Sequence, residues 1–255
     1  MYWKIVCATM NGTIHQKNGV RCQDRVRKHM SDGFACTTMA DGAGSVSRAS
    51  EGAELAVGGA SGILVQLGPR LFTMTEEEVA SVILSRLHEK IDEACLRHNC
   101  RRGDFATTLL FFATDGRRYV AGNLGDGLVG SIGSDGSSET ISGQERGPYS
   151  NYSFFLTDDD CMEHFRITSG DYDPGRVYFL MTDGSCDCLC LPREGTFARA
   201  LHEFARWTRE YPVHAVREAV LQNMHRLFPL RTNDDCALAL MMGQQGARTD
   251  TPGTT

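Results

Sequence analysis

The sequence has little that would tie the protein to a membrane or to nucleic acid. None of its apolar runs is long enough to span a bilayer, and residues 1–9 are too short and too polar for the apolar core of a signal peptide. No stripe of Lys and Arg is present, and the formal net charge of −6 disfavours nucleic acid as a partner. We therefore predict a cytoplasmic protein that binds neither a membrane nor nucleic acid.

The sequence also lacks the pattern of a zinc finger, although it contains ten cysteines. A chain of 255 residues can bury a sizeable core and does not need disulfides for stability. Without an export signal, free thiols in a reducing compartment are the better interpretation. Cys186, Cys188 and Cys190 form a C-x-C-x-C run, but no Cys or His pair at finger-like spacing lies nearby. We interpret this run as small apolar side chains around a turn.

Internal repeats are absent, and a composition of 41% apolar and 23% charged residues is that of an ordinary globular protein. The length favours one large domain, which we place at residues 1–242. Residues 243–255 contain almost no apolar side chain, so the sequence predicts a disordered tail there.

Hydrophobic periodicity predicts strands and helices that occur in groups. Strands are expected at residues 2–9, 34–40, 106–113, 118–124, 128–132, 152–156, 164–168, 176–182 and 236–242, with the first two paired. Helices are expected at residues 45–67, 75–98, 196–210 and 213–227, and Thr75 with Glu78 forms a capping box for the second helix. The stretches 11–27 and 134–150 are polar and are expected outside the core. This order predicts an α+β fold with mostly antiparallel sheets.

Short acidic turns follow or precede several of the expected strands. They are Asp41-Gly42-Ala43-Gly44, Gly125-Asp126-Gly127, Asp183-Gly184 and Asp234-Asp235. A single Asp-Gly is a routine turn dipeptide. Four acidic turns at strand ends instead favour one oxygen-rich site for a hard divalent cation such as Mg²⁺ or Mn²⁺.

Such a site has a defined chemistry if the acids converge. Two divalent ions that share a bridging carboxylate can activate a water for in-line attack on phosphorus. The reaction needs no serine or cysteine nucleophile, because the task of the protein is positioning and electrostatic stabilisation. Asp41 is the best candidate for the bridge, because Gly42 leaves its backbone carbonyl open to a metal. Asp183 and Asp234 would complete the shell of the first ion.

In their order and approximate spacing, these motifs resemble the signature motifs of the protein phosphatase 2C family, the metal-dependent serine/threonine phosphatases. The matching segments are Asp41-Gly42-Ala43-Gly44-Ser45, Gly125-Asp126-Gly127, Thr182-Asp183-Gly184 and Asp234-Asp235-Cys236-Ala237. Gly12-Thr13-Ile14-His15 and Cys22-Gln23-Asp24 resemble the first motif of a bacterial branch. The resemblance covers about residues 5–242. It implies two antiparallel sheets in a sandwich, helices on both outer faces and a di-metal site at one end.

The resemblance also implies a role for each matching acid. Asp41 would bridge two Mn²⁺ or Mg²⁺ ions, and the Gly42 carbonyl oxygen would be a further ligand. Asp183 and Asp234 would bind the first ion. Asp24 would lie close by and hold metal-bound water.

Asp126, together with Asp183, would match the weaker third metal position of bacterial members. Thr107 and Thr108 precede a buried strand and are interpreted as structural. Residues 143–159, which include Glu145, Tyr149, Asn151 and Tyr152, occupy the position of a variable flap beside the active site of the family.

Two positions depart from the family pattern. Gln23 stands in place of the usual acid, which should weaken binding of the second ion. His15 stands where the family has an arginine that grips phosphate, and a histidine lacks the bidentate fork and carries part of the charge at neutral pH. Arg21 or Lys17 would be alternative cations for the phosphate.

Three functions follow from this set of residues. The first is a metal-dependent phosphatase that acts on phosphoserine or phosphothreonine in proteins. We expect it to be a monomer and to have a cognate serine/threonine kinase as a further partner. The second is an inactive binding or regulatory module on the same fold, supported by Gln23 and His15. The third is a metal-dependent hydrolase of small phosphorylated molecules, which the ligand set alone does not exclude.

Overall fold

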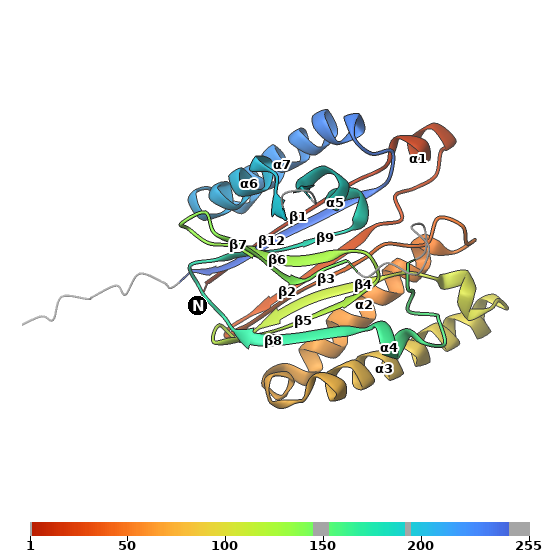
Figure 1. Ribbon diagram of the computed structural model, residues 1–255. Coiled ribbons are helices and arrows are strands. Elements are labelled where there is room, and N and C mark those ends of the chain that lie inside the picture. The colour runs from red at the N-terminus through yellow and green to blue at the C-terminus, as the bar shows by residue number, and fades with distance from the viewer. Residues whose placement is uncertain (1, 145–152, 192–194, 245–255) are drawn as a thin grey trace, which may run out of the picture.

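The computed structural model describes residues 2–144, 153–191 and 195–244. Figure 1 shows two sheets stacked face to face, with helices outside each of them. The strand order is β1-β12-β9-β6-β7 in the first sheet and β2-β3-β4-β5-β8 in the second. Neighbouring strands in both sheets are antiparallel, as in the predicted α+β sandwich.

The bounds of the elements are as follows. The first sheet contains β1 (Tyr2–Met10), β12 (Cys236–Gln244), β9 (Val177–Met181), β6 (Leu128–Ile132) and β7 (Ser138–Ser142). The second contains β2 (Arg25–Ser31), β3 (Phe34–Ala40), β4 (Leu109–Thr114), β5 (Arg118–Leu124) and β8 (Arg166–Asp171), and β10 (Cys190–Leu191) pairs with β11 (Thr196–Phe197). The helices are α1 (Thr13–Asn18), α2 (Ala49–Leu67), α3 (Glu76–His98), α4 (Cys161–His164), α5 (Asp183–Leu189), α6 (Arg199–Glu210) and α7 (Val213–Leu227). Single 3-10 turns are η1 (Gly68–Thr73), η2 (Arg102–Phe105) and η3 (Phe228–Leu230).

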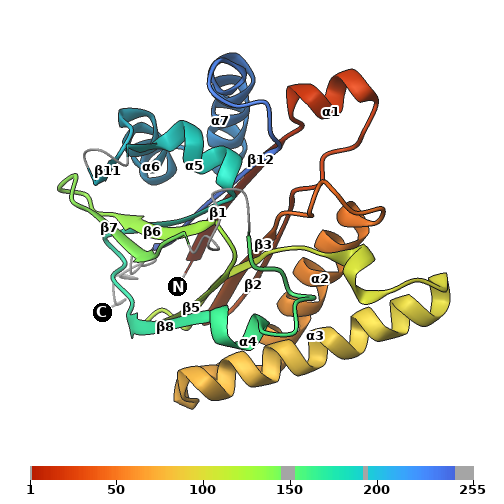
Figure 2. The same ribbon diagram turned by 45° about the vertical axis from the view of Figure 1, so that its right-hand side comes forward.

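Three apolar layers hold the sandwich together. One lies between the two sheets and contains Ile5 and Met39. A second packs α2 and α3 against the outer face of the β3 sheet, and a third packs α5, α6 and α7 against the β12 sheet. Figure 2 shows the same arrangement from a second direction. Central strands are therefore covered on both faces, which explains why β3 is buried along its whole length and reads as an apolar run.

The start of α3 follows directly from its sequence. The Thr75 hydroxyl accepts a hydrogen bond from the Glu78 backbone N–H at 3.2 Å, and the Glu78 carboxylate accepts one from the Thr75 N–H at 2.8 Å. The predicted capping box is thus confirmed. Glu76 and Glu77 add negative charge at the positive end of the helix dipole.

Several predicted elements are wrong in detail. Strand β1 pairs with β12 and not with residues 34–40, which form β3 in the other sheet. The polar stretches contain α1, the start of β2 and β7, and no sheet strand forms at residues 153–156. Cys186 and Cys188 lie on α5 instead of around a turn.

Helix α2 needs separate comment because of its composition. Together with η1, over Ala49–Thr73, it is long and apolar enough by length and composition to cross a membrane, contrary to our reading of the sequence. In this fold the helix packs against β3, and its small residues, such as Ala53, Ala56 and Ala60, are fully buried. These contacts are those of a core helix.

Removal of the α3 cap should lower stability in a measurable way. We expect Thr75→Ala to lower the free energy of unfolding by about 1 kcal/mol, because a backbone N–H of the first turn loses its partner. Urea denaturation measures this change. Ser81→Ala, at an exposed position inside the same helix, is the matched control and should be neutral or slightly stabilising. Equal effects of the two substitutions would contradict a role for the cap.

Candidate metal centre and active site

Five aspartates gather where the ends of the two sheets meet. We call Asp24, Asp41, Asp126, Asp183 and Asp234 the acid cluster. Each lies just outside a strand of the sandwich, and the electrostatic interactions among them link every member to at least one other. The structure thus brings together all the carboxylates that the sequence singled out as metal ligands.

The β2–β3 pairing brings Asp24 beside Asp41. Arg25 is opposite Ala40 in the register, so the preceding and following aspartates leave the two strands at the same end. The charge of Asp24 therefore acts on Asp41. The β2–β3 hairpin, whose two strands are neighbours in the sequence, therefore places Asp24 beside Asp41.

The β9–β12 pairing does the same for Asp183 and Asp234. Leu238 is opposite Met181, and the Thr182 hydroxyl accepts a hydrogen bond from the Ala237 N–H at 2.9 Å. Asp183 therefore follows one strand at the edge where Asp234 precedes the other. This pairing joins segments that are about fifty residues apart, which no local pattern in the sequence reveals.

Asp126 lies in the connection from β5 to β6, which crosses from one sheet to the other. Its carboxylate accepts a hydrogen bond from the Ser153 hydroxyl, and its backbone carbonyl accepts one from Gln144 Nε2 at 2.7 Å. The charge of Asp126 acts on Asp183. The predicted flap residues Glu145, Tyr149, Asn151 and Tyr152 lie outside the described residues.

Two threonines fix the backbone of Asp41. The Thr107 hydroxyl donates to the Asp41 carbonyl at 2.8 Å, and the Thr108 N–H donates to the same oxygen at 2.9 Å. The Thr108 hydroxyl accepts from the Asp41 N–H at 3.0 Å. The prediction that they are structural missed this positioning role, and only their place before β4 hinted at it.

The backbone carbonyl of Gly42 has no hydrogen-bond donor within the described part of the chain. It is thus available to a cation, as the family resemblance implies. Gly42 itself is required by packing, since a Cβ here would lie 2.4 Å from the Ala49 carbonyl oxygen at the start of α2. The Gln23 side-chain oxygen lies near this turn, 3.6 Å from the Cβ position of Gly44.

Asp24 is the deepest member of the cluster, with 2% of its surface exposed. Its Oδ2 accepts a hydrogen bond from the Thr182 hydroxyl at 2.6 Å, whereas its buried Oδ1 has no partner. A buried carboxylate oxygen without a partner is costly. It indicates a position that a cation or an ordered water would satisfy.

Burial and neighbouring negative charges raise the pKa of several carboxyls in the acid cluster. Burial raises the pKa of Asp24 and of Asp41 well above their ordinary values, and the charges of Asp24 and Asp183 add to the shift of Asp41. Burial and the charges of Asp126 and Asp234 raise the pKa of Asp183 to about 7. Asp41 and Asp183 keep some surface exposure and Asp234 is exposed, so the cluster is recessed yet open on one side.

These residues fit a divalent cation. Within the described residues, no Lys or Arg forms an ion pair with the cluster, so its carboxylates repel one another without compensation. Hard carboxylate and carbonyl oxygens are the donors that Mg²⁺ and Mn²⁺ prefer. In the part of the chain that the structure describes, no three His, Cys, Asp or Glu side chains lie close enough together to hold a metal ion without moving.

The basic residues predicted to contact the phosphate are His15, Lys17 and Arg21, which lie on α1 or shortly after it. His15 contacts Asp235, with 3.0 Å between Nδ1 and Oδ2. Arg21 and Lys17 are exposed, and neither forms an ion pair or hydrogen bond with another described residue. The structure therefore joins His15 to the neighbourhood of the acids and leaves the other two in solvent.

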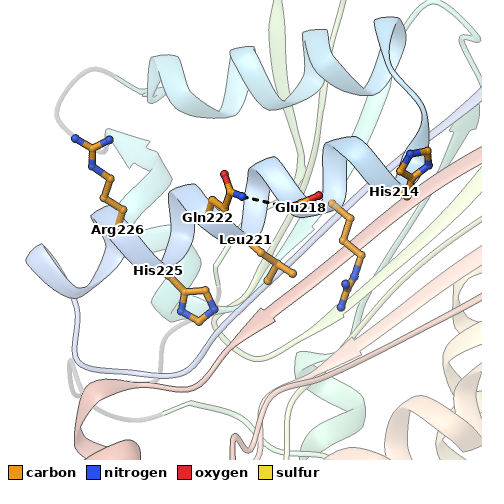
Figure 3. A pocket seen from close by; sticks show the side chains of 7 residues that line it. His214, Glu218, Leu221, Gln222, His225 and Arg226 are labelled. Atoms are coloured by element: carbon orange, nitrogen blue, oxygen red, sulfur yellow. Dashed lines mark hydrogen bonds between the residues drawn. The ribbon is translucent and has the colours of Figure 1, made fainter.

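Another hollow of the molecule lies on α7 and is distinct from the acid cluster. Figure 3 shows it, lined by His214, Arg217, Glu218, Leu221, Gln222, His225 and Arg226. None of the predicted site residues lines it. It does not contribute to the metal centre.

A family model for protein phosphatase 2C matches residues 11–224, which is most of the chain. The chain belongs to the protein phosphatase 2C family. Among curated relatives, serine/threonine-protein phosphatase 3 of Escherichia coli (strain K12) is 26% identical over 191 residues, covering 72% of this chain and 74% of that protein. The predicted enzyme class, a metal-dependent serine/threonine phosphatase, is thereby confirmed.

Solved structures of bacterial phosphatases have the same fold. The S. agalactiae serine/threonine phosphatase is similar with a TM-score of 0.68 and 14% identity, covering 95% of this chain and all (100%) of that one. The catalytic domain of the serine/threonine phosphatase PstP, in complex with two manganese ions, gives a TM-score of 0.66 at 14% identity, covering 94% and 97%. PppA of Pseudomonas aeruginosa gives 0.67 at 16% identity, covering 95% and 98%. At these identities the likeness shows the fold.

The stability of the metal-free protein should depend on pH through the acid cluster. The pKa values of Asp24, Asp41, Asp183 and Asp234 are raised in the folded protein, whereas those of the unfolded chain lie at about 4. The folded state therefore holds protons that the unfolded state has lost, and stability should fall as the pH rises from about 4 to about 7. Thermal unfolding in excess chelator across this range measures the trend.

Added Mn²⁺ should stabilise the protein increasingly over the same pH range, because the ion competes with protons for the carboxylates. Asp32→Asn, which removes an exposed carboxylate from the turn between β2 and β3 outside the cluster, is the matched control and should keep this pH dependence. Equal stabilisation by Mn²⁺ at about pH 5 and about pH 8 would show that the carboxyls with raised pKa values do not hold the metal.

Proposed function

We propose that the acid cluster is the catalytic centre with which this chain hydrolyses phosphoserine and phosphothreonine in proteins. The observation that carries the proposal is the recessed set of uncompensated carboxylates, with the unpartnered Asp24 Oδ1 at its base. We propose that the cluster binds two ions of Mn²⁺ or Mg²⁺.

The electrostatics support a division of roles. The charges of Asp24, Asp183 and Asp234 all act on Asp41, which suits a carboxylate shared between two ions. Asp183 and Asp234 interact with each other and would bind the first ion, and the Gly42 carbonyl oxygen would be a further ligand beside Asp41. The charge of Asp126 also acts on Asp183, which supports these two residues as a third metal position.

Bound divalent ions would offset charge on the phosphoryl oxygens and make a water nucleophilic at neutral pH. The residues of the chain contribute positioning. Thr107 and Thr108 hold the backbone of Asp41, and Thr182 holds one oxygen of Asp24. The other Asp24 oxygen has no partner and would be able to accept a hydrogen bond from a water at the site. A site preorganised in this way needs no covalent intermediate.

The assay that tests the function is hydrolysis of a phosphothreonine peptide with Mn²⁺, with Mg²⁺ and with excess chelator. Metal-dependent turnover that chelator removes would support the proposal. A nucleotide phosphate serves as the competing substrate, and preference for it would favour a small-molecule hydrolase. Metal binding without turnover of either substrate would favour a binding module.

The remaining expectations are part of the same proposal. We propose a cytoplasmic phosphatase that acts as a monomer and opposes a serine/threonine kinase. The formal net charge of −6 supports a protein substrate over nucleic acid. Gel filtration at several concentrations tests the monomeric state.

Asp41→Asn should abolish metal-dependent turnover, with a loss of at least about 100-fold in kcat/KM, the scale of losing one preorganised electrostatic contact. The fold should survive, because the amide keeps the size of the side chain and removes a carboxyl with an unfavourably raised pKa. The metal-free Tm should therefore not fall. Asp32→Asn, in the exposed turn between β2 and β3, is the charge-matched control and should keep its activity. Turnover that persists in the Asp41 variant would exclude the di-metal assignment.

Gln23→Glu should lower the Mn²⁺ concentration needed for half-maximal activity by about tenfold, the scale of a group that supports a metal from its outer shell. The reason is that the new carboxylate would lie beside the Gly42–Gly44 turn, where the amide oxygen now lies. Titration of activity with Mn²⁺ measures the effect. An unchanged or higher requirement would contradict the view that Gln23 limits the second ion.

A further inference from the structure

Six of the ten cysteines, all of which are free thiols, form three pairs in which one thiol is hydrogen-bonded to the other. The pairs are Cys95 with Cys100, Cys186 with Cys190, and Cys188 with Cys236. Burial distinguishes them. Cys186, Cys188 and Cys236 are buried, whereas Cys95 and Cys100 are both partly exposed. Among the three pairs, only the pair at the end of α3 presents both of its thiols to solvent.

The backbone at the end of α3 brings Cys95 and Cys100 together. The Cys100 N–H donates to the Cys95 carbonyl at 3.1 Å, and Asn99 between them has left-handed backbone angles, with φ at 50°. This is the closing bond of a Schellman motif, in which the side chains of the two bonded residues lie in contact. A bond of this length also keeps the two Cα atoms within about 7 Å of each other, the largest separation that a disulfide can bridge.

Contacts on both sides of the turn hold it in place. The Arg102 guanidinium, just after the turn, donates to both carboxylate oxygens of Asp92 on α3, each at 2.5 Å. Cys95 and Cys100 also pack against the apolar layer that α2 and α3 form on the β3 sheet. The two thiols are therefore held next to each other by the fold itself.

The surroundings suit the two thiols to different roles in an oxidation. Partial burial and the neighbouring Cys100 thiol raise the pKa of Cys95. Cys95 is thus suited to be the resolving thiol, and Cys100 to be the thiol that attacks an oxidant. A partly exposed thiol beside a resolving thiol is the arrangement found in cysteines that respond to oxidants.

We propose that Cys95 and Cys100 are a site of reversible oxidation, at which a hydroperoxide converts the two thiols to a disulfide. The Cys100 sulfur attacks one peroxide oxygen, so that the O–O bond breaks and a sulfenic acid forms. The Cys95 sulfur then attacks the sulfenic sulfur, the S–S bond forms, and the S–O bond breaks with loss of water. The two thiols lose two electrons and two protons in total, and hydrogen peroxide is reduced to two waters. A reduced thiol reverses the reaction by thiol–disulfide exchange.

The experiment exposes the reduced full chain to hydrogen peroxide, alkylates the remaining thiols and maps tryptic peptides by mass spectrometry. Cleavage after Lys90, Arg97 and Arg101 places the two cysteines on separate peptides, residues 91–97 and 98–101. We expect a disulfide between these two peptides as the first crosslink to form. Dithiothreitol should separate them again.

Cys95→Ser should abolish this crosslink and leave the Cys100 sulfenic acid to be trapped by dimedone, because the resolving thiol is missing. Cys100→Ser should also abolish the crosslink and leave little dimedone label on Cys95. Cys190→Ser removes a partly exposed thiol of another pair, so it is the matched control and should keep the crosslink. The Tm of each reduced variant verifies that it is folded.

The disulfide should raise the Tm of the wild-type protein by about 3 °C or more, because it removes chain entropy from the unfolded state without distorting a turn that is already closed. The Tm of Cys95→Ser should not rise on the same treatment. An unchanged or lower Tm of the crosslinked wild-type protein would contradict the fit between the turn and a disulfide.

Two mapping results would overturn the proposal. One is a first crosslink between Cys186 and Cys190 or between Cys188 and Cys236. The other is the absence of any crosslink at the end of α3 while peroxide oxidises other thiols. Neither Cys95 nor Cys100 belongs to the acid cluster, and the readouts are mass and Tm. A failure of the proposed phosphatase activity would therefore leave this test unaffected.

Discussion

The convergence of carboxylates at one end of a β-sandwich is the constraint on which the rest of the structure depends. Like charges in a partly desolvated site repel one another, so the fold must hold them together against their own electrostatics. Two antiparallel pairings do this. The β2–β3 register places Asp24 next to Asp41, and the β9–β12 register places Asp183 next to Asp234. The unfavourable charge is what gives the site its affinity for a divalent cation.

Support for these acids comes from neighbouring hydroxyl and backbone groups rather than from basic side chains. Thr107 and Thr108 hold the backbone of Asp41, and Thr182 joins Asp24 to β12 through the Ala237 N–H. Neutral donors of this kind fix position without neutralising the negative charge. An arginine in the same place would compete with the metal. The pattern of support therefore suits a site that binds cations and then an anionic substrate.

Elements with a strong local signal were predictable from the sequence. Helix α7 has the predicted bounds, and α3 begins at its capping box, because helix periodicity and caps are short-range properties. Strands β2 and β7, each at an edge of its sheet, were missed because their residues are polar and mostly exposed. Edge strands carry polar and charged residues that discourage pairing with other molecules, so they lack the apolar pattern of a central strand. The partner of β1 was wrong because pairing joins segments more than two hundred residues apart in the chain.

The sequence by itself determined the kinds of groups available: four acidic turns in a family-specific order, glycines beside them, and Gln23 and His15 as departures. Tertiary structure alone decided which of these groups meet. It brought the acids to one edge and left Arg21 in solvent. It also gave Asp234 and Asp235, neighbours in the chain, opposite environments. The physical reason is that desolvation and charge–charge interaction depend on distance and burial, which arise from contacts between segments far apart in the sequence.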